Sequence, residues 1–335
     1  MSASYEPNFQ APPPPATPPA EAKAPRPTYL RPVAIGAFVL GLIVIGGWAA
    51  KFIPRGVGPG AALCFFGVLL FGLSFIRLPG VPEKEQPLSF LGKVGGVFFE
   101  PGRVFRNLRE HPQWLGAFVL ISVLTTIYSF AFVNRITPER IVDHMDEKLA
   151  QMGSFAPPPE VREQQKVQNL EAFKNPVQQI TGIASSWVGL FVVSVIVAAL
   201  SLLGVLAFGG RINFWQALAV TFYAALPVVV IQKLLGLVIL YLKSPEDLHP
   251  ILNQETTLQD NLGILFSPAE HPVLFVIASF IGITSFYGLW LRAKGLHLAA
   301  TKASSGVGWG VAITIWVLFL FLATIVTALF PGFIG

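Results

Sequence analysis

The chain has 335 residues, of which 53% are hydrophobic and only 12% are charged, with a mean hydropathy of +0.63 and a formal net charge of +5. An average soluble domain carries about 25% charged residues, so this chain has too few charges to cover a surface that faces water. The composition excludes disulfide-stapled, collagen-like and ordinary soluble enzyme classes, and it predicts an all-α integral membrane protein.

Residues 1–32 are rich in proline, including the run Pro12–Pro15, and contain few apolar side chains. Such a segment cannot bury enough surface to fold, so we expect a disordered leader with polyproline character. Docking of its PxxP pattern onto a proline-reading domain is the alternative, less favoured for so short a pattern. A cleaved signal peptide is disfavoured because this leader precedes the first apolar run.

Runs of about 20 apolar residues cross a hydrocarbon core about 30 Å thick, and helices satisfy their own backbone hydrogen bonds there. The sequence predicts a polytopic transmembrane helical bundle of about seven spans, an N-terminal hairpin over residues 33–77 and five spans over residues 113–335. A five-span protein with a re-entrant hairpin is the alternative. The predicted spans are Val33–Ala50, Gly60–Ile76, Trp114–Val133, Ile183–Phe208, Trp215–Tyr241, Pro272–Leu291 and Val307–Phe330.

Lysine and arginine residues in the loops predict the orientation, because cytoplasmic loops carry an excess of them. Thirteen lie on the side that holds the leader and nine on the other, where acidic residues of the long third loop outnumber the basic ones. We therefore expect a cytoplasmic N-terminus, an extracytoplasmic C-terminus and, as the membrane, a bacterial inner membrane.

Residues 88–112 repeat apolar side chains at helical spacing beside a basic face, interrupted at Glu100-Pro101-Gly102. This pattern predicts an interfacial amphipathic segment on the anionic cytoplasmic leaflet. The residues predicted to contact membrane lipids or a protein partner are Phe98, Arg103, Phe105, Arg106 and Arg109, and Lys93 is expected on the same basic face.

The extracytoplasmic loop over residues 134–182 predicts a helical hairpin. Thr137 before Pro138 is typical of a helix start, so the first helix is expected over Pro138–Met152. The run Pro157–Pro159 breaks it, a second helix follows over Glu160–Lys174, and Pro176 restarts a helix that continues into the fourth span.

The sequence contains no constellation typical of catalysis. Its five histidines are scattered, with no HExxH pattern, and the single Cys64 lies in an apolar run. We therefore expect neither enzyme activity nor a metal site, cofactor or nucleic-acid partner, and we interpret Glu246–His249 as a solvated loop. Small residues four apart predict close helix packing at Gly306 and Gly310, at Ala278 and Gly282, and at Ser194 and Ala198.

Lys233 lies inside the fifth predicted span, next to Gln232 and six residues after Pro227. A charge in hydrocarbon is expensive and is by default a sign of function, although a long side chain can snorkel to the interface. Snorkelling is the favoured interpretation. A substrate pathway beside a proline kink is the alternative.

Three stretches resemble the Yip family of Ypt/Rab-interacting membrane proteins, in its bacterial branch. They are Phe99–Phe105 followed by His111–Trp114, Phe214–Leu218 leading to Tyr223 and Pro227, and Phe286–Trp290 followed by Lys294–Leu296. The resemblance covers Phe98–Leu329 and implies five spans. The eukaryotic members are non-enzymatic partners of Rab GTPases and carry an Asp-Leu-Tyr-Gly-Pro motif, which this sequence lacks.

The sequence thus predicts a non-enzymatic membrane protein that acts as a scaffold or as a membrane-organising, trafficking-like factor. Its partners would be the anionic leaflet and a membrane or cytoplasmic protein. A small-solute or lipid transporter with a pathway near Lys233 is the alternative.

Overall fold

The computed structural model of the chain describes residues 30–50, 64, 67–68, 71–72, 75, 87–151, 156–255 and 257–329. These residues form helices and loops, with two isolated β-bridges, which confirms the all-helical class. The predicted leader lies almost wholly outside the described residues. So do the loop that follows the first predicted span and most of the second span.

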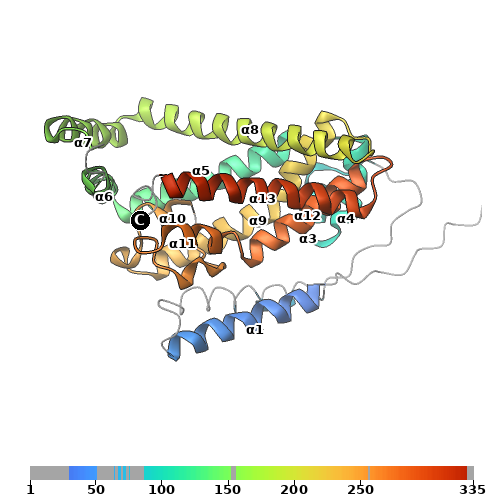
Figure 1. The fold of residues 1–335 in the computed structure, drawn as a ribbon, viewed down its shortest axis with the longest axis horizontal. Helices are drawn as coiled ribbons and strands as arrows, with labels where there is room; N and C mark the ends of the chain where they lie inside the picture. The colour runs from blue at the N-terminus through green and yellow to red at the C-terminus, as the bar shows by residue number, and fades with distance from the viewer. Residues whose placement is uncertain are drawn as a thin grey trace, which may run out of the picture.

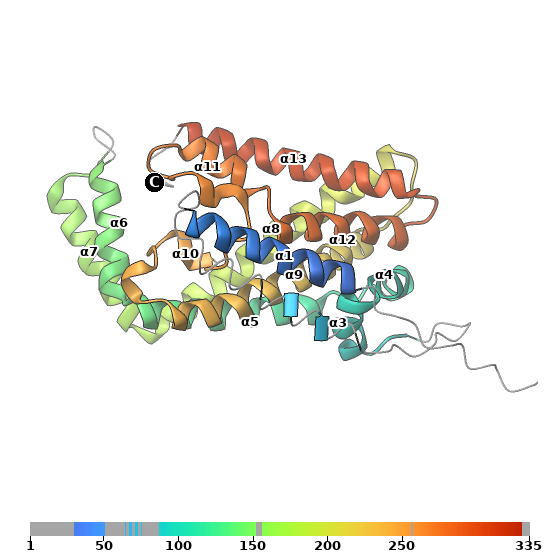
Figure 2. The same cartoon turned by 90° about the horizontal axis from the view of Figure 1, so that it is seen from below.

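Figures 1 and 2 show the long helices running side by side, with a short helical hairpin at one end. The helices are α1 (Leu30–Ala49), α3 (Phe90–Phe99), α4 (Pro101–Glu110), α5 (Leu115–Ile136), α6 (Pro138–Gln151), α7 (Pro159–Lys174), α8 (Pro176–Ala207), α9 (Phe214–Leu242), η2 (Pro245–Asp247), α10 (Leu252–Glu255), η3 (Leu262–Leu265), α11 (Pro272–Ser279), α12 (Ile283–Ala299) and α13 (Ser305–Leu329).

Four of the described helices are long and apolar enough to cross a membrane, namely α5, α8, α9 and α13. Each coincides with a predicted span. Capping residues mark the starts of two of them. Asn175 accepts a hydrogen bond from the backbone N–H of Val177 at the start of α8, and Asn213 forms a capping box with Gln216 at the start of α9. The count of about seven spans stays a prediction.

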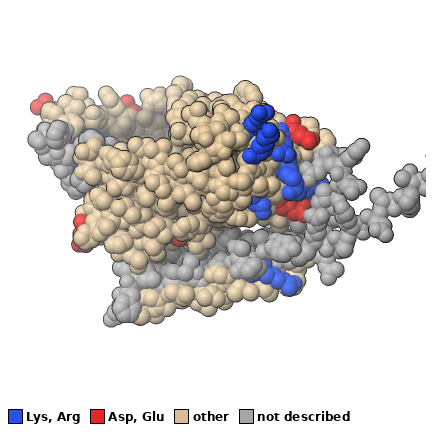
Figure 3. All heavy atoms as spheres, turned by 45° about the vertical axis from the view of Figure 1, so that its right-hand side comes forward, with Lys and Arg blue, Asp and Glu red and all other residues tan. Residues whose placement is uncertain are grey.

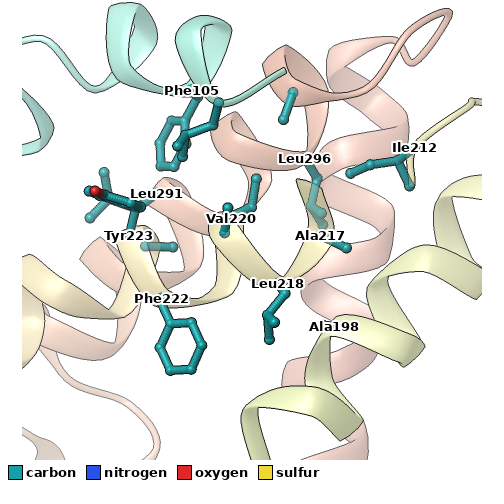
Figure 4. Close-up of a cluster of buried hydrophobic side chains, with 14 of the residues drawn as sticks. Phe105, Ala198, Ile212, Ala217, Leu218, Val220, Phe222, Tyr223, Leu291 and Leu296 are labelled. Carbon is teal, nitrogen blue, oxygen red and sulfur yellow. The ribbon is translucent and has the colours of Figure 1, made fainter. Parts of the chain in front are cut away.

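Helix α9 lies at the centre of the bundle and packs against α5, α8 and α12. Its first half is almost continuously buried, and small side chains such as Ala217, Ala219 and Ala224 bring the neighbouring helices close. Figure 4 shows Leu218, Val220 and Phe222 from the first half of α9 among residues of α4, α8 and α12.

The sixth predicted span, Pro272–Leu291, is not one continuous helix. It is divided into α11 and α12 at Phe280–Gly282, where Gly282 forms a β-bridge with Asn261. The loop before α11 folds back onto this break, and the Asp260 carboxylate accepts a hydrogen bond from the backbone N–H of Thr284 at 2.7 Å. The apolar composition predicted an uninterrupted helix. The break is possible because the Asp260 carboxylate accepts the hydrogen bond of a backbone N–H that a continuous helix would have satisfied.

The predicted small-residue contacts are partly wrong. Among the described residues, a Cβ on Gly310 would meet nothing within 4 Å and one on Gly306 only Ser304, whereas Gly308 packs against the backbone of Ala293 in α12. Gly308 is two residues from Gly306 and from Gly310, so it lies on the opposite face of the helix. The pattern of small residues four apart therefore predicted the wrong face of α13 for the contact. Gly282 contacts Asn261 rather than another helix. Ala278, Ser194 and Ala198 are buried.

The predicted hairpin is confirmed as α6 and α7, although Met152 lies outside the described residues. The two helices pack together, and two ion pairs link them: Arg162 to Asp146 at 3.3 Å and Lys166 to Asp143 at 2.8 Å. The hairpin lies at the end of the bundle opposite α3 and α4 (Figure 1).

We expect Gly308→Ala to destabilise the protein by about 1–3 kcal/mol, because the added methyl group would overlap the Ala293 carbonyl oxygen. Gly310→Ala is the matched control on the same helix and should be neutral or slightly stabilising, since its space is open. Thermal unfolding in detergent measures both. Equal loss in the two variants would contradict this account of the packing between α12 and α13.

Candidate functional site

The first candidate site is the amphipathic pair α3 and α4, which covers one end of the bundle. The Ser89 side chain caps α3, and Pro101 begins α4 directly after the break at Glu100. Val104 and Leu108 are completely buried, whereas Arg106 and Arg109 are exposed. The pair therefore turns an apolar face toward the bundle and a basic face outward, as the periodicity predicts.

Two of the predicted contact residues face inward instead. Phe105 is completely buried against α9 and α12, and its ring lies where a Cβ on Gly295 would be (Figure 4). Lys93 is also completely buried, and its ammonium donates to the Gln113 side chain at 2.9 Å. Burial lowers the pKa of Lys93. The prediction that Phe105 contacts lipid and that Lys93 joins the basic face is corrected.

The remaining predicted residues lie nearer the surface. Phe98 is half-buried and packs against the core, and Arg103 is partly exposed, 3.6 Å from the Glu100 carboxylate. Figure 3 shows Lys and Arg side chains gathered at this end of the molecule, which we call the basic end. It comprises α4, the start of α9, the end of α12 and the start of α13.

Hydrogen bonds between helices fix the basic end. The Arg109 guanidinium donates to the carbonyl oxygen of Ala300, just beyond α12, at 2.6 Å. The Gln216 amide in the first turn of α9 donates to the carbonyl oxygen of Arg109 at 2.6 Å. Because α4 is tied to both α9 and α12, its basic face is held in a fixed orientation to the bundle.

The second candidate site surrounds Lys233. Its side chain is buried, and the ammonium lies 4.5 Å from the centre of the Tyr128 ring in α5. The Tyr128 hydroxyl donates to the carbonyl oxygen of Asn253 at 2.7 Å, and Thr257 donates to that of Gly236 at 2.7 Å. Lys233 is thus held against an aromatic face within the bundle, an arrangement that stabilises a cation.

The other predicted members of this cluster have separate partners. The Gln232 amide donates to the Thr284 hydroxyl at 3.1 Å, and the same Thr284 is held through its backbone by Asp260. Pro227 is buried inside α9. The sequence interpretation missed Tyr128, Thr257 and Asp260. They lie far from Lys233 in the sequence, and no local pattern predicts that they pack near it or near its partner Thr284. Transport past Lys233 stays a prediction.

A third polar region lies at the hairpin end, where α6 meets the loop after α9. A cavity of about 470 Å³ is lined by both the helix and the loop. The rings of His144 and His249 pack edge to face, with 4.8 Å between the ring centres. Arg140 donates to the carbonyl oxygens of Pro245, Glu246 and Leu248 and so ties the loop to α6. In the described part of the chain, no three His, Cys, Asp or Glu side chains are grouped to hold a metal.

Comparison with known proteins gives one match. A family model described as the Yip1 domain matches residues 95–326. No curated protein and no solved structure matches the chain. The matched range begins within α3 and ends within α13, so it includes the basic face of α4, the Lys233 cluster, three continuous candidate spans and most of the fourth.

We expect Tyr128→Phe to destabilise the protein by about 1–3 kcal/mol, because it leaves the buried Asn253 carbonyl oxygen without this donor while keeping the ring beside Lys233. Tyr241→Phe is the control, because the Tyr241 side chain is 60% exposed and its replacement should change the stability little. Thermal unfolding of both variants in detergent tests this. If Tyr128→Phe unfolds at the same temperature as the wild type, the hydrogen bond from Tyr128 to Asn253 does not stabilise the protein.

We expect docking of α6 on the loop to weaken as the pH falls below about 6.5, the ordinary pKa of histidine. Burial is the main cause that lowers the pKa of His144, and undocking removes it, so the undocked form binds the proton more readily than the docked form. Amide hydrogen exchange of α6, corrected for the intrinsic pH dependence, measures the effect. His144→Gln should remove most of this dependence, and an unchanged pH profile in that variant would count against it.

Proposed function

The chain belongs to the Yip1-domain family, as the resemblance predicts, and on this premise we propose that it is a non-enzymatic scaffold that organises its membrane. It does so by gathering anionic lipids, and the partners that bind them, at the basic end. The apolar helices support a multi-pass integral membrane protein. Neither the bacterial branch nor the bacterial inner membrane is needed for this proposal.

The observation that carries the proposal is the fixed basic face of α4. Arg106 and Arg109 are exposed and Arg103 is partly so, while the opposite face of the helix is buried in the core. A basic amphipathic helix at the end of a bundle lies where phospholipid headgroups are, and each basic residue near an anionic surface contributes about 1 kcal/mol.

The charge distribution supports an orientation for this surface. Arg211, Lys294 and Lys302 lie at the same end as α4, whereas the hairpin end carries most of the acidic side chains of the described loops. By the positive-inside rule, we propose that the basic end faces the cytoplasm. The C-terminus would then be extracytoplasmic, because α13 runs from the basic end to the hairpin end (Figure 2). The N-terminus would be cytoplasmic, because Lys23, Arg26 and Arg31 of the leader sequence follow the same rule.

We expect the triple variant Arg103→Glu, Arg106→Glu, Arg109→Glu to lose selectivity for anionic lipid several-fold. The full chain is reconstituted in mixed phosphatidylglycerol and phosphatidylcholine bilayers, and electron paramagnetic resonance of spin-labelled lipids measures the protein-associated fraction of each. Added salt should lower the wild-type selectivity toward that of the variant, because exposed charges are screened.

Lys174→Glu is the control variant, since it reverses an exposed charge at the end of α7, in the opposite hairpin. Its lipid selectivity should equal that of the wild type. If the triple variant keeps the wild-type preference for phosphatidylglycerol, the basic face of α4 does not gather anionic lipid and the proposal fails.

A further inference from the structure

A cavity of about 380 Å³ opens at the basic end between α4, α12 and α13. The side chains that give it its chemistry are Arg106, Trp290, Lys294, His297, Ser305 and Trp309. It is separate from the core shown in Figure 4 and lies beside the basic face of α4. Its size suits a small polar group rather than a protein segment.

Two cations are brought together in this cavity. Gly102, in the first turn of α4, has no side chain, and a Cβ there would lie 3.4 Å from Lys294 Cε and 3.8 Å from an Arg106 guanidinium nitrogen. Among the described residues that line the cavity, none is an aspartate or a glutamate. Burial lowers the pKa of Lys294, and the Arg106 charge lowers it further. An anion placed between the two cations would favour the charged form of Lys294 and so offset both causes of the lowered pKa.

Aromatic side chains complete the wall. The Lys294 ammonium lies 4.7 Å from the centre of the Trp290 ring, and Trp309, on the second turn of α13, also lines the cavity. Both indoles are partly exposed, at 36% and 38%. Tryptophan is typical of the membrane interface, where one edge of the ring meets apolar lipid and the N–H meets polar groups.

We propose that this cavity is a specific site for the phosphate headgroup of an anionic phospholipid. Arg106 and Lys294 bind the phosphate oxygens, and Trp290 and Trp309 pack against the glycerol and the first acyl carbons. The site rests on the proposed function, since it names one lipid bound tightly among those that α4 gathers. A lipid is favoured over free phosphate because free phosphate has no apolar part for the two tryptophans.

Native mass spectrometry of the delipidated full chain tests the site. Phosphatidylglycerol and phosphatidylcholine with identical acyl chains are added separately, and retained lipid is counted. We expect one retained phosphatidylglycerol and much weaker phosphatidylcholine binding. Lys294→Gln should weaken the phosphatidylglycerol affinity about tenfold, the loss that corresponds to about 1.4 kcal/mol.

Lys302→Gln is the matched control, because it removes the same charge from an exposed position at the same end but outside the cavity lining. Its affinity should be unchanged. Lys294→Arg should restore binding, which separates loss of the charge from a folding defect, and Trp309→Ala should weaken binding while keeping both cations.

Three results would overturn the inference. They are equal retention of the two lipids, equal loss in Lys294→Gln and Lys302→Gln, and displacement of the lipid by inorganic phosphate at matched concentration, which would make the site one for free phosphate. The two proposals fail separately. Loss of spin-label selectivity in the triple α4 variant without a retained lipid supports only the lipid-gathering surface, whereas a retained lipid with unchanged selectivity supports only the cavity.

Discussion

The close packing of α9 against its neighbours is the constraint on which the rest of the structure depends. In a membrane the lipid is as apolar as the side chains, so helices associate through close contact and hydrogen bonds. The alanines of α9, including Ala217, Ala219 and Ala224, allow α5, α8 and α12 to approach it. The first turn of α9 also holds α4, through Gln216, so the central helix sets the position of the basic end.

The basic end is therefore a product of the bundle and not a separate module. α4 contributes Phe105 and Leu108 to the core, and Arg109 ties it to the residue after α12. Those contacts decide which side chains remain outside. The same helix forms one wall of the cavity that contains Lys294, so the proposed lipid-gathering surface and the proposed site for a single lipid share one helix.

Polar side chains inside the bundle form hydrogen bonds to backbone groups of its irregular segments. Asp260 supplies the acceptor for the start of α12, Thr257 donates to α9, and Tyr128 donates to the loop at Asn253. Unsatisfied backbone groups are costly in such an environment. This network accounts for the divided sixth helix, and it gives Lys233 an aromatic neighbour in place of water.

The sequence by itself determined the elements whose signals are local. Apolar length predicted α5, α8, α9 and α13, and prolines and caps predicted the break at Pro101 and the hairpin ends near Pro138 and Lys174. Only the tertiary structure decided which faces meet. The burial of Phe105 and Lys93, the contact at Gly308 and the pairing of Asp260 with Thr284 depend on chain segments far apart in sequence. Periodicity gives a helix its faces, but the partner that covers each face is set by packing.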